Sequence, residues 1–524
     1  MVKPRIDRDG MLFPRWANRQ QLFDSYRMPD RVRRLTAAVV AFVLLVDFTV
    51  TRGADWPMRG GNRNRNAVVP DVKGPTEWNL AEGQRPAKNI RWSAELGYVS
   101  CGDPVIAGGL VWVGTNNGLS KEDASVLMCF RERDGQLLYK YVSPRLVGEG
   151  HLNSDWPGTS LASSPLVEGN RLWFCTNRCE VICLEIAPLR SGTGEPRVVW
   201  KVDMRSQLGV FPVGVHLGSH ASHCSIAAYK DLIYVNTTNA ARYDKIPAPD
   251  APSLVCFQKQ NGQVRWQDKS PGKNILNAQL GSPLVIEAMG QAQVVMGQGD
   301  GWVRGFDALT GEMLWKFDIN RKSSKTGFLA GNRGDHRSDL VAMPVFHDNR
   351  VYFAVGRNYE SCFGQGKVCC LDPTKRGDIS SELNDGPDHG RPNPNSGLVW
   401  EYLGEGDAEE TRMNRTLASV VIHKNLVIAT DQSGIAHCLD VRNGKKLWTH
   451  DAKAAIIGSP LIVGDTIYVS TDEGVVVLLE LSRQKRLIAE RELDQSIESG
   501  PAFANGVLYL MNRNSLFAIS ESPN

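Results

Sequence analysis

The stretch FDALTGEMLWKFD, residues 306–318, carries an Asp, a Gly four residues later and a Trp four residues after that. The same spacing returns in LDVRNGKKLW at 439–448. FQKQNGQVRW at 257–266 keeps the Gly and the Trp, and FRERDGQLLY at 130–139 keeps the Gly and ends in Tyr. Because a pattern that recurs along one chain is typical of a repeated structural unit, we interpret the stretch as a turn between strands rather than as a catalytic motif.

Each of the three recurring residues has a structural role in such a turn. Gly311 allows the positive φ that a tight turn requires. We expect Asp307 to accept hydrogen bonds from the turn backbone. Trp315 is predicted to cover apolar area between neighbouring units.

A second recurring signal is an apolar strand with a small residue or Pro near its start, as in GSPLVIEA (281–288) and GSPLIVGDTIYVST (458–471). Consecutive markers are 61, 61, 57, 61, 76, 40 and 41 residues apart. The shortest steps match the length of a propeller blade, and the longer ones contain Pro-, Asp- or Gly-rich insertions such as 241–253 and 377–397. The eight markers are Pro104, Pro165, Ile226, Pro283, Pro344, Val420, Pro460 and Pro501.

Each unit contains four short β-type runs separated by turns, for example Pro460–Val463, Thr466–Ser470, Val475–Leu481 and Arg486–Glu490. Nothing in these runs has helical periodicity, which indicates antiparallel meanders. A single four-stranded sheet cannot bury both of its faces, whereas eight sheets packed radially can. The sequence therefore predicts an all-β fold, an eight-bladed β-propeller of four-stranded antiparallel blades.

The last unit is incomplete, because the chain ends at Asn524 after strands at Val507–Met511 and Ser515–Ile519. A matching Trp-bearing strand occurs near the other end, in NIRWSAEL at 89–96. We expect Trp92 to complete the eighth blade, so that the N-terminal strand closes the ring.

Residues 1–54 are predicted to be a signal peptide, with a basic segment at Arg31–Arg34, an apolar run from Ala37 to Val46 and small residues before the cleavage site. Translation starting at Met28 and a retained membrane anchor are the alternatives. Residues 55–87 form an N-terminal extension, and 88–522 the propeller. Without the ten Lys/Arg and five Asp/Glu of the leader, the formal net charge falls from +3 to −2, which argues against nucleic-acid binding.

The repeated turn, the SP-type inner strand and the eight-fold count resemble the PQQ-repeat, or quinoprotein-like, β-propellers. WPMRGGNRNRN (56–66) and CCLDPTKRGDIS (369–380) resemble a planctomycete-type subgroup of that family. The resemblance covers residues 88–522. It implies one of two functions: a periplasmic dehydrogenase that uses PQQ with calcium, or a BamB-like envelope protein that has no cofactor and binds partners.

The family's dehydrogenases cover their quinone with a disulfide between adjacent cysteines, and Cys369–Cys370 is the one candidate for it. Adjacent side chains on a strand point to opposite faces, so we expect no disulfide here. Cys370 shares its repeat position with Cys129, Cys183, Cys256 and Cys438, while Gly305 and Ala518 fill it in other blades. This position is predicted to be a small, tightly packed slot in the core. We therefore expect no cofactor, with PQQ and calcium as the alternative.

The loops that enter the inner strands of a propeller gather at one mouth of the central channel, where ligands commonly bind. The candidate ligand-binding residues in these loops are His151, Asp155, Trp156, His216, His220, His223, Arg333, Asp335, His336, Arg337, Arg412 and Arg415. The arginines suit carboxylate or sulfate groups. His216, His220, His223 and Cys224 are also a possible metal site, although their spacing matches no established motif. Cys175 and Cys179 flank a turn and could form a local disulfide.

These observations together predict an exported, periplasmic or cell-envelope propeller that acts as a non-catalytic binding or scaffold module. The expected partner is an envelope protein or a polar or anionic small molecule at the channel mouth, and the expected state is a monomer. A PQQ- and calcium-dependent oxidoreductase is the alternative, and a metal-dependent enzyme a third hypothesis.

Overall fold

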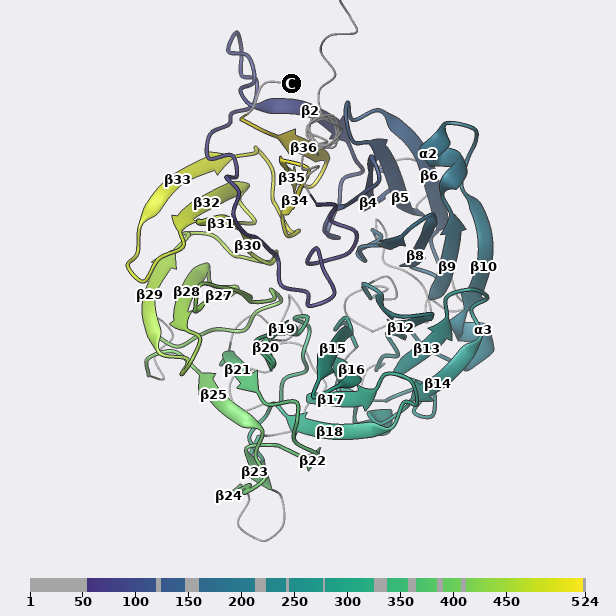
Figure 1. Cartoon of the computed structure of the whole chain (residues 1–524), viewed down its shortest axis with the longest axis vertical. Coiled ribbons are helices and arrows are strands. Elements are labelled where there is room, and N and C mark those ends of the chain that lie inside the picture. Colours follow the sequence, from purple (N-terminus) through teal and green to yellow (C-terminus); the bar gives the residue numbers. More distant parts are fainter. Residues whose placement is uncertain are drawn as a thin grey trace, which may run out of the picture. The chain divides into compact units, whose positions relative to one another are not determined.

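The computed structural model describes residues 54–118, 124–146, 160–212, 223–241, 245–276, 279–324, 337–356, 364–383, 390–406 and 411–521. They belong to one compact unit, Ala54–Asn524. Eight four-stranded antiparallel sheets stand around a central axis, as Figure 1 shows. The predicted eight-bladed β-propeller is confirmed.

In every blade the chain runs from the axis outward, and only the last blade takes its outer strand from the N-terminal side. Blades one to four comprise β3 (Val105–Ala107), β4 (Leu110–Asn116), β5 (Ala124–Arg131) and β6 (Leu137–Pro144); β7 (Leu166–Glu168), β8 (Arg171–Cys175), β9 (Glu180–Glu185) and β10 (Arg197–Asp203); β11 (Ala227–Tyr229), β12 (Leu232–Asn236), β13 (Leu254–Gln258) and β14 (Val264–Asp268); and β15 (Leu284–Ala288), β16 (Gln291–Gly297), β17 (Trp302–Asp307) and β18 (Met313–Asp318). Blades five to eight comprise β19 (Val345–His347), β20 (Arg350–Val355), β21 (Lys367–Leu371) and β25 (Leu398–Tyr402); β26 (Val421–His423), β27 (Leu426–Thr430), β28 (Ile435–Asp440) and β29 (Lys446–Asp451); β30 (Leu461–Val463), β31 (Thr466–Ser470), β32 (Val475–Glu480) and β33 (Leu487–Glu492); and β34 (Ala502–Ala504), β35 (Val507–Met511), β36 (Ser515–Ile519) and β2 (Ile90–Glu95).

The ring closes as the sequence predicts. Strand β2 pairs antiparallel with β36, and Trp92 lies opposite Ala518. The first strand of the propeller and the last one therefore share a sheet, and the hydrogen bonds of that sheet hold the ring shut.

A repeated pair of residues forms the outer part of each blade interface. The small slot on the third strand lies opposite the large aromatic residue on the outer strand, as in Cys256 opposite Trp266 and Gly305 opposite Trp315. Blade seven departs from this rule, because the larger Leu478 lies opposite the smaller Ala489. The predicted packing role of the cysteine position is confirmed for the cysteines, which are buried in the core.

The turn glycine packs against the tryptophan of the preceding blade. Gly311 has φ +77°, and a Cβ there would lie 2.6 Å from the ring of Trp266. Trp266 Nε1 donates to Ala308 O at 3.0 Å in the same turn. Asp307 Oδ1 accepts from the backbone N–H groups of Leu309 and Thr310, each at 2.9 Å. The expected roles of Gly311 and Asp307 are confirmed, and the Gly and Trp of successive repeats fasten one blade to the next.

A second set of contacts joins the blades near the axis, at the residue before the marker position. Ser225 Oγ accepts from Ser164 N at 3.1 Å, and Ser282 Oγ accepts from Ser225 N at 3.0 Å. Ser459 Oγ accepts from Ser419 N at 2.9 Å in the same manner. The Pro that follows tolerates this place because the inner strand has a free edge and its N–H is not needed. The SP pair of the sequence is therefore an inter-blade contact.

The N-terminal extension enters the ring. Residues 56–69, which we call the plug, begin beside the turn at Gly108, pair with Ile106 and end along β30, and the purple trace in Figure 1 shows them inside the ring of blades. Strand β1 (Val68–Val69) pairs parallel with β30. Further backbone hydrogen bonds run from the plug to Ile106, Val167 and Phe346. The plug thus supplies partners for inner-strand edges that would otherwise be open.

The plug turns sharply at two glycines. Gly60 has φ +74° and Gly61 has φ +77°. A Cβ on Gly60 would lie 2.8 Å from the backbone of Arg65, and one on Gly61 would lie 2.5 Å from the ring of Trp56. The WPMRGGNRN motif therefore encodes a compact turn that only glycine allows.

Insertions decorate the outer side of the ring. Strand β22 (Gly377–Asp378) adds a fifth, parallel strand to blade four, and β23 (Glu382–Leu383) pairs with β24 (Arg391–Pro392). The short helices are α2 (Ala187–Ser191), α3 (Met204–Leu208) and a 3₁₀ turn at Gly272–Asn274. In the part of the chain that the structure describes, no helix is long and apolar enough to cross a bilayer.

Candidate functional site

Arg65 is the residue that the plug places deepest among the blades. Its side chain is buried, with 1% of the residue's surface exposed. The guanidinium donates to the carbonyl oxygens of Arg59 at 3.0 Å, Ser225 at 3.1 Å and Ile226 at 2.8 Å. Burial lowers the pKa of Arg65 to about 10, so it remains a cation at neutral pH. One side chain thereby ties the plug to the third blade through main-chain acceptors.

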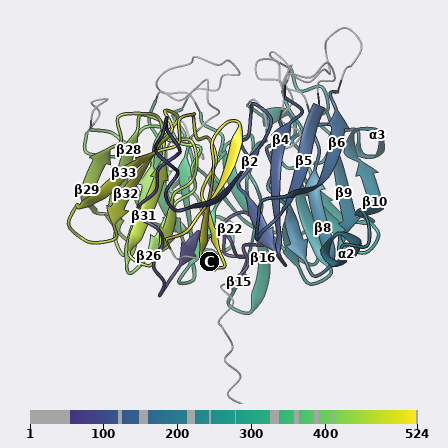
Figure 2. The ribbon, with the colours of Figure 1, turned by 90° about the horizontal axis from the view of Figure 1, so that it is seen from above.

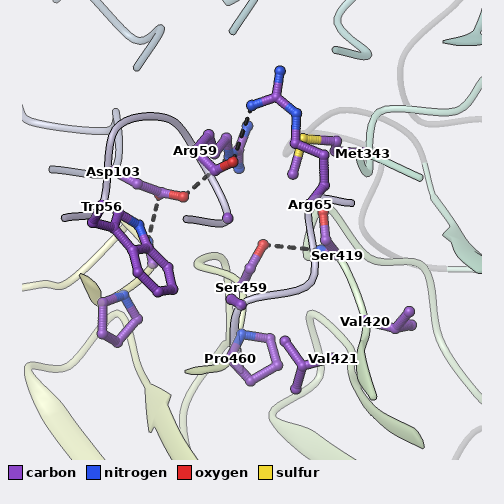
Figure 3. A pocket seen from close by; sticks show the side chains of 14 residues that line it. Trp56, Arg59, Arg65, Asp103, Met343, Ser419, Val420, Val421, Ser459 and Pro460 are labelled. Carbon is purple, nitrogen blue, oxygen red and sulfur yellow. Dashed lines mark hydrogen bonds and ion pairs between the residues drawn. The ribbon is translucent and has the colours of Figure 1, made fainter. Parts of the chain in front are cut away.

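A second cation of the plug pairs with the first blade. Arg59 Nε donates to Asp103 Oδ2 at 3.1 Å, and Asp103 Oδ1 accepts from Gly500 N at 2.7 Å. Figure 3 shows these groups around a small cavity between the plug and the inner strands. Its volume of about 10 Å³ accommodates one water-sized particle.

The structure leaves most of the predicted mouth residues untested. The residues that lie outside the described ranges are His151, Asp155, Trp156, His216, His220, Arg333, Asp335 and His336. They stay predictions, together with the mouth site as a whole. Figure 2 views the ring of blades from its side.

Arg337 belongs to a network of charges on blade four. Its Nη2 donates to Asp318 Oδ1 at 2.7 Å, and Lys322 Nζ donates to Asp318 Oδ2 at 2.8 Å. Lys322 Nζ also lies 4.5 Å from the centre of the Trp302 ring, and Lys316 Nζ lies 4.9 Å from it. Cations over the face of a tryptophan are stabilised by its quadrupole.

The same network continues below Trp302. Arg304 makes a bidentate pair with Asp300, at 3.0 and 2.6 Å. The cationic rim, as we call Arg304, Lys316, Lys322 and Arg337 around Trp302, is accompanied by carboxylates. Besides Asp300 and Asp318, Glu382 Oε2 accepts from the backbone N–H of Lys322 at 3.2 Å, and Asp378 lies opposite Lys316 in the strand pairing.

Arg412 and Arg415 lie elsewhere on the mouth, around a turn of blade six. Arg412 Nε donates to Asn414 Oδ1 at 3.0 Å. Arg415 is buried, and its guanidinium lies so close to Gly364 that a Cβ there would be 3.1 Å away. Arg415 is thus part of the packing between blades five and six.

The cysteine and histidine positions give no metal centre in the described part of the chain. His223 is half-buried, and Cys224 is buried with its Sγ accepting from Asn236 N at 3.2 Å. No group of three or more His, Cys, Asp or Glu able to hold a metal occurs among the described residues. A hydrogen bond with Cys224 and burial raise the pKa of the Cys175 thiol, and Cys175 and Cys179 are both free thiols.

Cys369 and Cys370 do not form the disulfide that covers the quinone in the family's dehydrogenases. Cys369 and Cys370 are buried free thiols on β21. Cys369 packs in the core between blades four and five, and Cys370 in the core between blades five and six. Because the two sulfurs face opposite sides of one sheet, they cannot form a joint cover over a ligand in the channel. The expected absence of a Cys369–Cys370 disulfide is confirmed.

Sequence reasoning missed both the plug and the cationic rim. Adjacent glycines beside Trp56 and two arginines were the signal for the plug, since such a cluster is unusual in a linker. The signal for the rim was the spacing of Trp302, Lys316 and Lys322, which pairing of β17 with β18 brings together.

Comparison with known sequences identifies the family. The matching family is described as "Outer membrane protein assembly factor BamB", and two overlapping matches cover residues 153–378 and 253–522. The chain belongs to this family. No curated protein matched the chain.

Solved structures share the fold of this BamB-family chain. BamB from Moraxella catarrhalis has a TM-score of 0.52 at 15% identity, covering 82% of this chain and 98% of that one. Quinohemoprotein alcohol dehydrogenase from Comamonas testosteroni has a TM-score of 0.59 at 13% identity, covering 93% and 84%. Sqt1 from Saccharomyces cerevisiae has a TM-score of 0.51 at 11% identity, covering 83% and 99%. At these identities the likeness concerns the fold alone.

Proposed function

We propose that this BamB-family propeller is a non-catalytic binding module of the cell envelope, exported by its leader, whose partner docks at the channel mouth. The observation that supports this most is the plug. Because residues 56–69 run inside the ring and bind the inner strands, the chain itself occupies part of the channel, and the mouth loops are the surface that we propose for a partner.

The cations near Trp302 are engaged within the chain, because Lys322 and Arg337 both bind Asp318 and Arg304 binds Asp300. The partner that we propose is an envelope protein or a polar or anionic small molecule. Half-buried Trp302 is the aromatic contact that the described residues offer it.

Photocrosslinking in intact cells tests the mouth as the docking surface. A photoreactive amino acid at Trp302 is expected to give a defined crosslinked product with one partner. The matched control is the same group at Met289, which is 86% exposed on a turn at the other end of blade four. Equal products from both positions, or none from Trp302, would reject docking at the mouth.

The quinoprotein alternative is tested separately. Purified protein is titrated with PQQ in the presence of Ca²⁺ and assayed for dye-linked alcohol oxidation. We expect neither saturable binding nor turnover, and a saturable signal with turnover would overturn the non-catalytic proposal.

Export is tested by sequencing the N-terminus of the protein isolated from its native cells. Cleavage after Ala54 gives a mature chain that begins at Asp55. That residue is already fixed, because its carboxylate accepts from Gly108 N at 2.9 Å. An uncleaved leader would instead support the retained anchor.

A further inference from the structure

The small cavity beside the plug has unusual chemistry for its size. It is lined by Trp56, Arg59 and Arg65 of the plug, and by Asp103, Ser419 and other residues at the starts of the inner strands (Figure 3). The blades that contribute belong to both ends of the chain. Whatever occupies the cavity therefore contacts the plug and the ring at once.

Two buried donors that line the cavity lack partners among the described residues. They are Trp56 Nε1, in a residue 4% exposed, and Ser419 Oγ, in a residue 3% exposed. A buried polar group without a partner costs about 1–3 kcal/mol. An indole N–H can only donate, so the missing partner of Trp56 must be an acceptor.

The charges around the cavity point in the same direction. Arg59 and Arg65 are cations, and Asp103 is the one carboxylate among the described residues that line it. Both carboxylate oxygens of Asp103 already accept a hydrogen bond, from Arg59 and from Gly500. Arg65 is therefore left without a carboxylate among these lining residues, and its buried charge is balanced only by the carbonyl oxygens to which it donates.

We propose that this cavity binds a single monatomic anion, with chloride as the ligand available to the protein. The anion accepts from Trp56 Nε1 and Ser419 Oγ and balances the excess charge of Arg59 and Arg65. A water molecule would accept the same bonds but would leave the charge unbalanced and would need acceptors for its own two protons. The anion fastens the plug to blade six.

Bromide provides the direct test on the full mature chain. Crystals grown in sodium bromide are expected to show one anomalous peak between Trp56 Nε1 and Ser419 Oγ. A water there in both bromide and chloride, with no anomalous signal, would overturn the proposal.

Thermal unfolding supplies an independent test with matched variants. At constant ionic strength, chloride and bromide should raise the Tm by about 1–3 °C over gluconate, which is too large for the cavity. Trp56→Phe, which keeps a ring without the N–H, should lose this increment. The control is Trp78→Phe, because Trp78 Nε1 is also buried without a partner in the described chain but lines a separate groove beside β33. Equal Tm values in chloride and gluconate for the wild type would contradict the anion.

Discussion

The blades of this propeller meet in two places that are built differently. At the outer rim, the same pair recurs from blade to blade, a turn glycine such as Gly311 beneath a tryptophan such as Trp266. At the axis, serines join only some of the blades, and a single plug with its own arginines completes the rest. The outer contacts between blades come from repeated residues, whereas those at the axis come from a segment that occurs once. Mutations at the two places should therefore lower the free energy of unfolding by different amounts.

The largest loss of stability is expected at the outer contacts between blades. Trp266→Ala removes a buried ring and its hydrogen bond to Ala308, and should lower the free energy of unfolding by about 3–5 kcal/mol. Urea unfolding measures this. Trp266→Phe should lose markedly less, and an equal loss would mean that the hydrogen bond, rather than ring packing, dominates.

The second-largest loss of stability is expected at the axis. Arg65→Met removes a buried cation from its carbonyl acceptors and should cost about 2–4 kcal/mol. Arg63→Met is the matched control two residues away, because Arg63 pairs with Glu287 at the surface and should cost less than about 1 kcal/mol. Similar losses from both variants would show that the plug does not need its buried cation.

The turn glycine separates steric contact from backbone strain. Gly311→Ala places a Cβ against Trp266 at a positive φ and should cost about 1–3 kcal/mol. Gly506→Ala has φ +78° but meets nothing within 4 Å, so it reports the backbone cost alone. If the two variants unfold at the same urea concentration, the contact between Gly311 and Trp266 contributes nothing to stability.

The smallest expected effect is the pH dependence of the stability that Asp307 contributes. Burial alone would raise the pKa of Asp307, but hydrogen bonds from Gln291 and the turn N–H groups outweigh it and hold the pKa below its ordinary value. The carboxylate therefore stabilises the fold above about pH 4, and this contribution is lost as the pH falls through the folded pKa. Asp307→Asn should reduce stability by less than about 1 kcal/mol at pH 7, and the difference from the wild type should shrink in acid. A difference that is constant with pH would assign the effect to shape rather than charge.

The same contrast explains what the sequence could and could not predict. The Gly–Trp contacts between the outer parts of the blades were predictable because their residues recur, so that one blade tests the interpretation of another. Trp92 could be assigned to the last blade by the pattern alone. The plug occurs once, and nothing in its spacing says that Arg65 lies against Ser225, which is 160 residues away. Blade seven also departs from the repeat, with Leu478 opposite Ala489, and the sequence analysis assigned no residue of that blade to the small slot.

The candidate site was the least predictable part. The loops at the mouth could be named from the blade count, whereas the contacts of Arg337 with Asp318 and of Arg415 near Gly364 depend on neighbouring strands. Residues of one type in two loops, Arg337 and Arg415, have different surroundings. Side-chain type alone could not separate a rim cation from a packed one.

The plug also has a consequence for how the protein is made. It is among the first parts of the mature chain to be synthesised, yet its partners extend to Ile462 and Gly464 in the seventh blade. It cannot reach its place until nearly the whole ring has been produced, and contacts of such high sequence separation slow folding. We therefore expect the ring to stay open at the axis until the seventh blade has been synthesised.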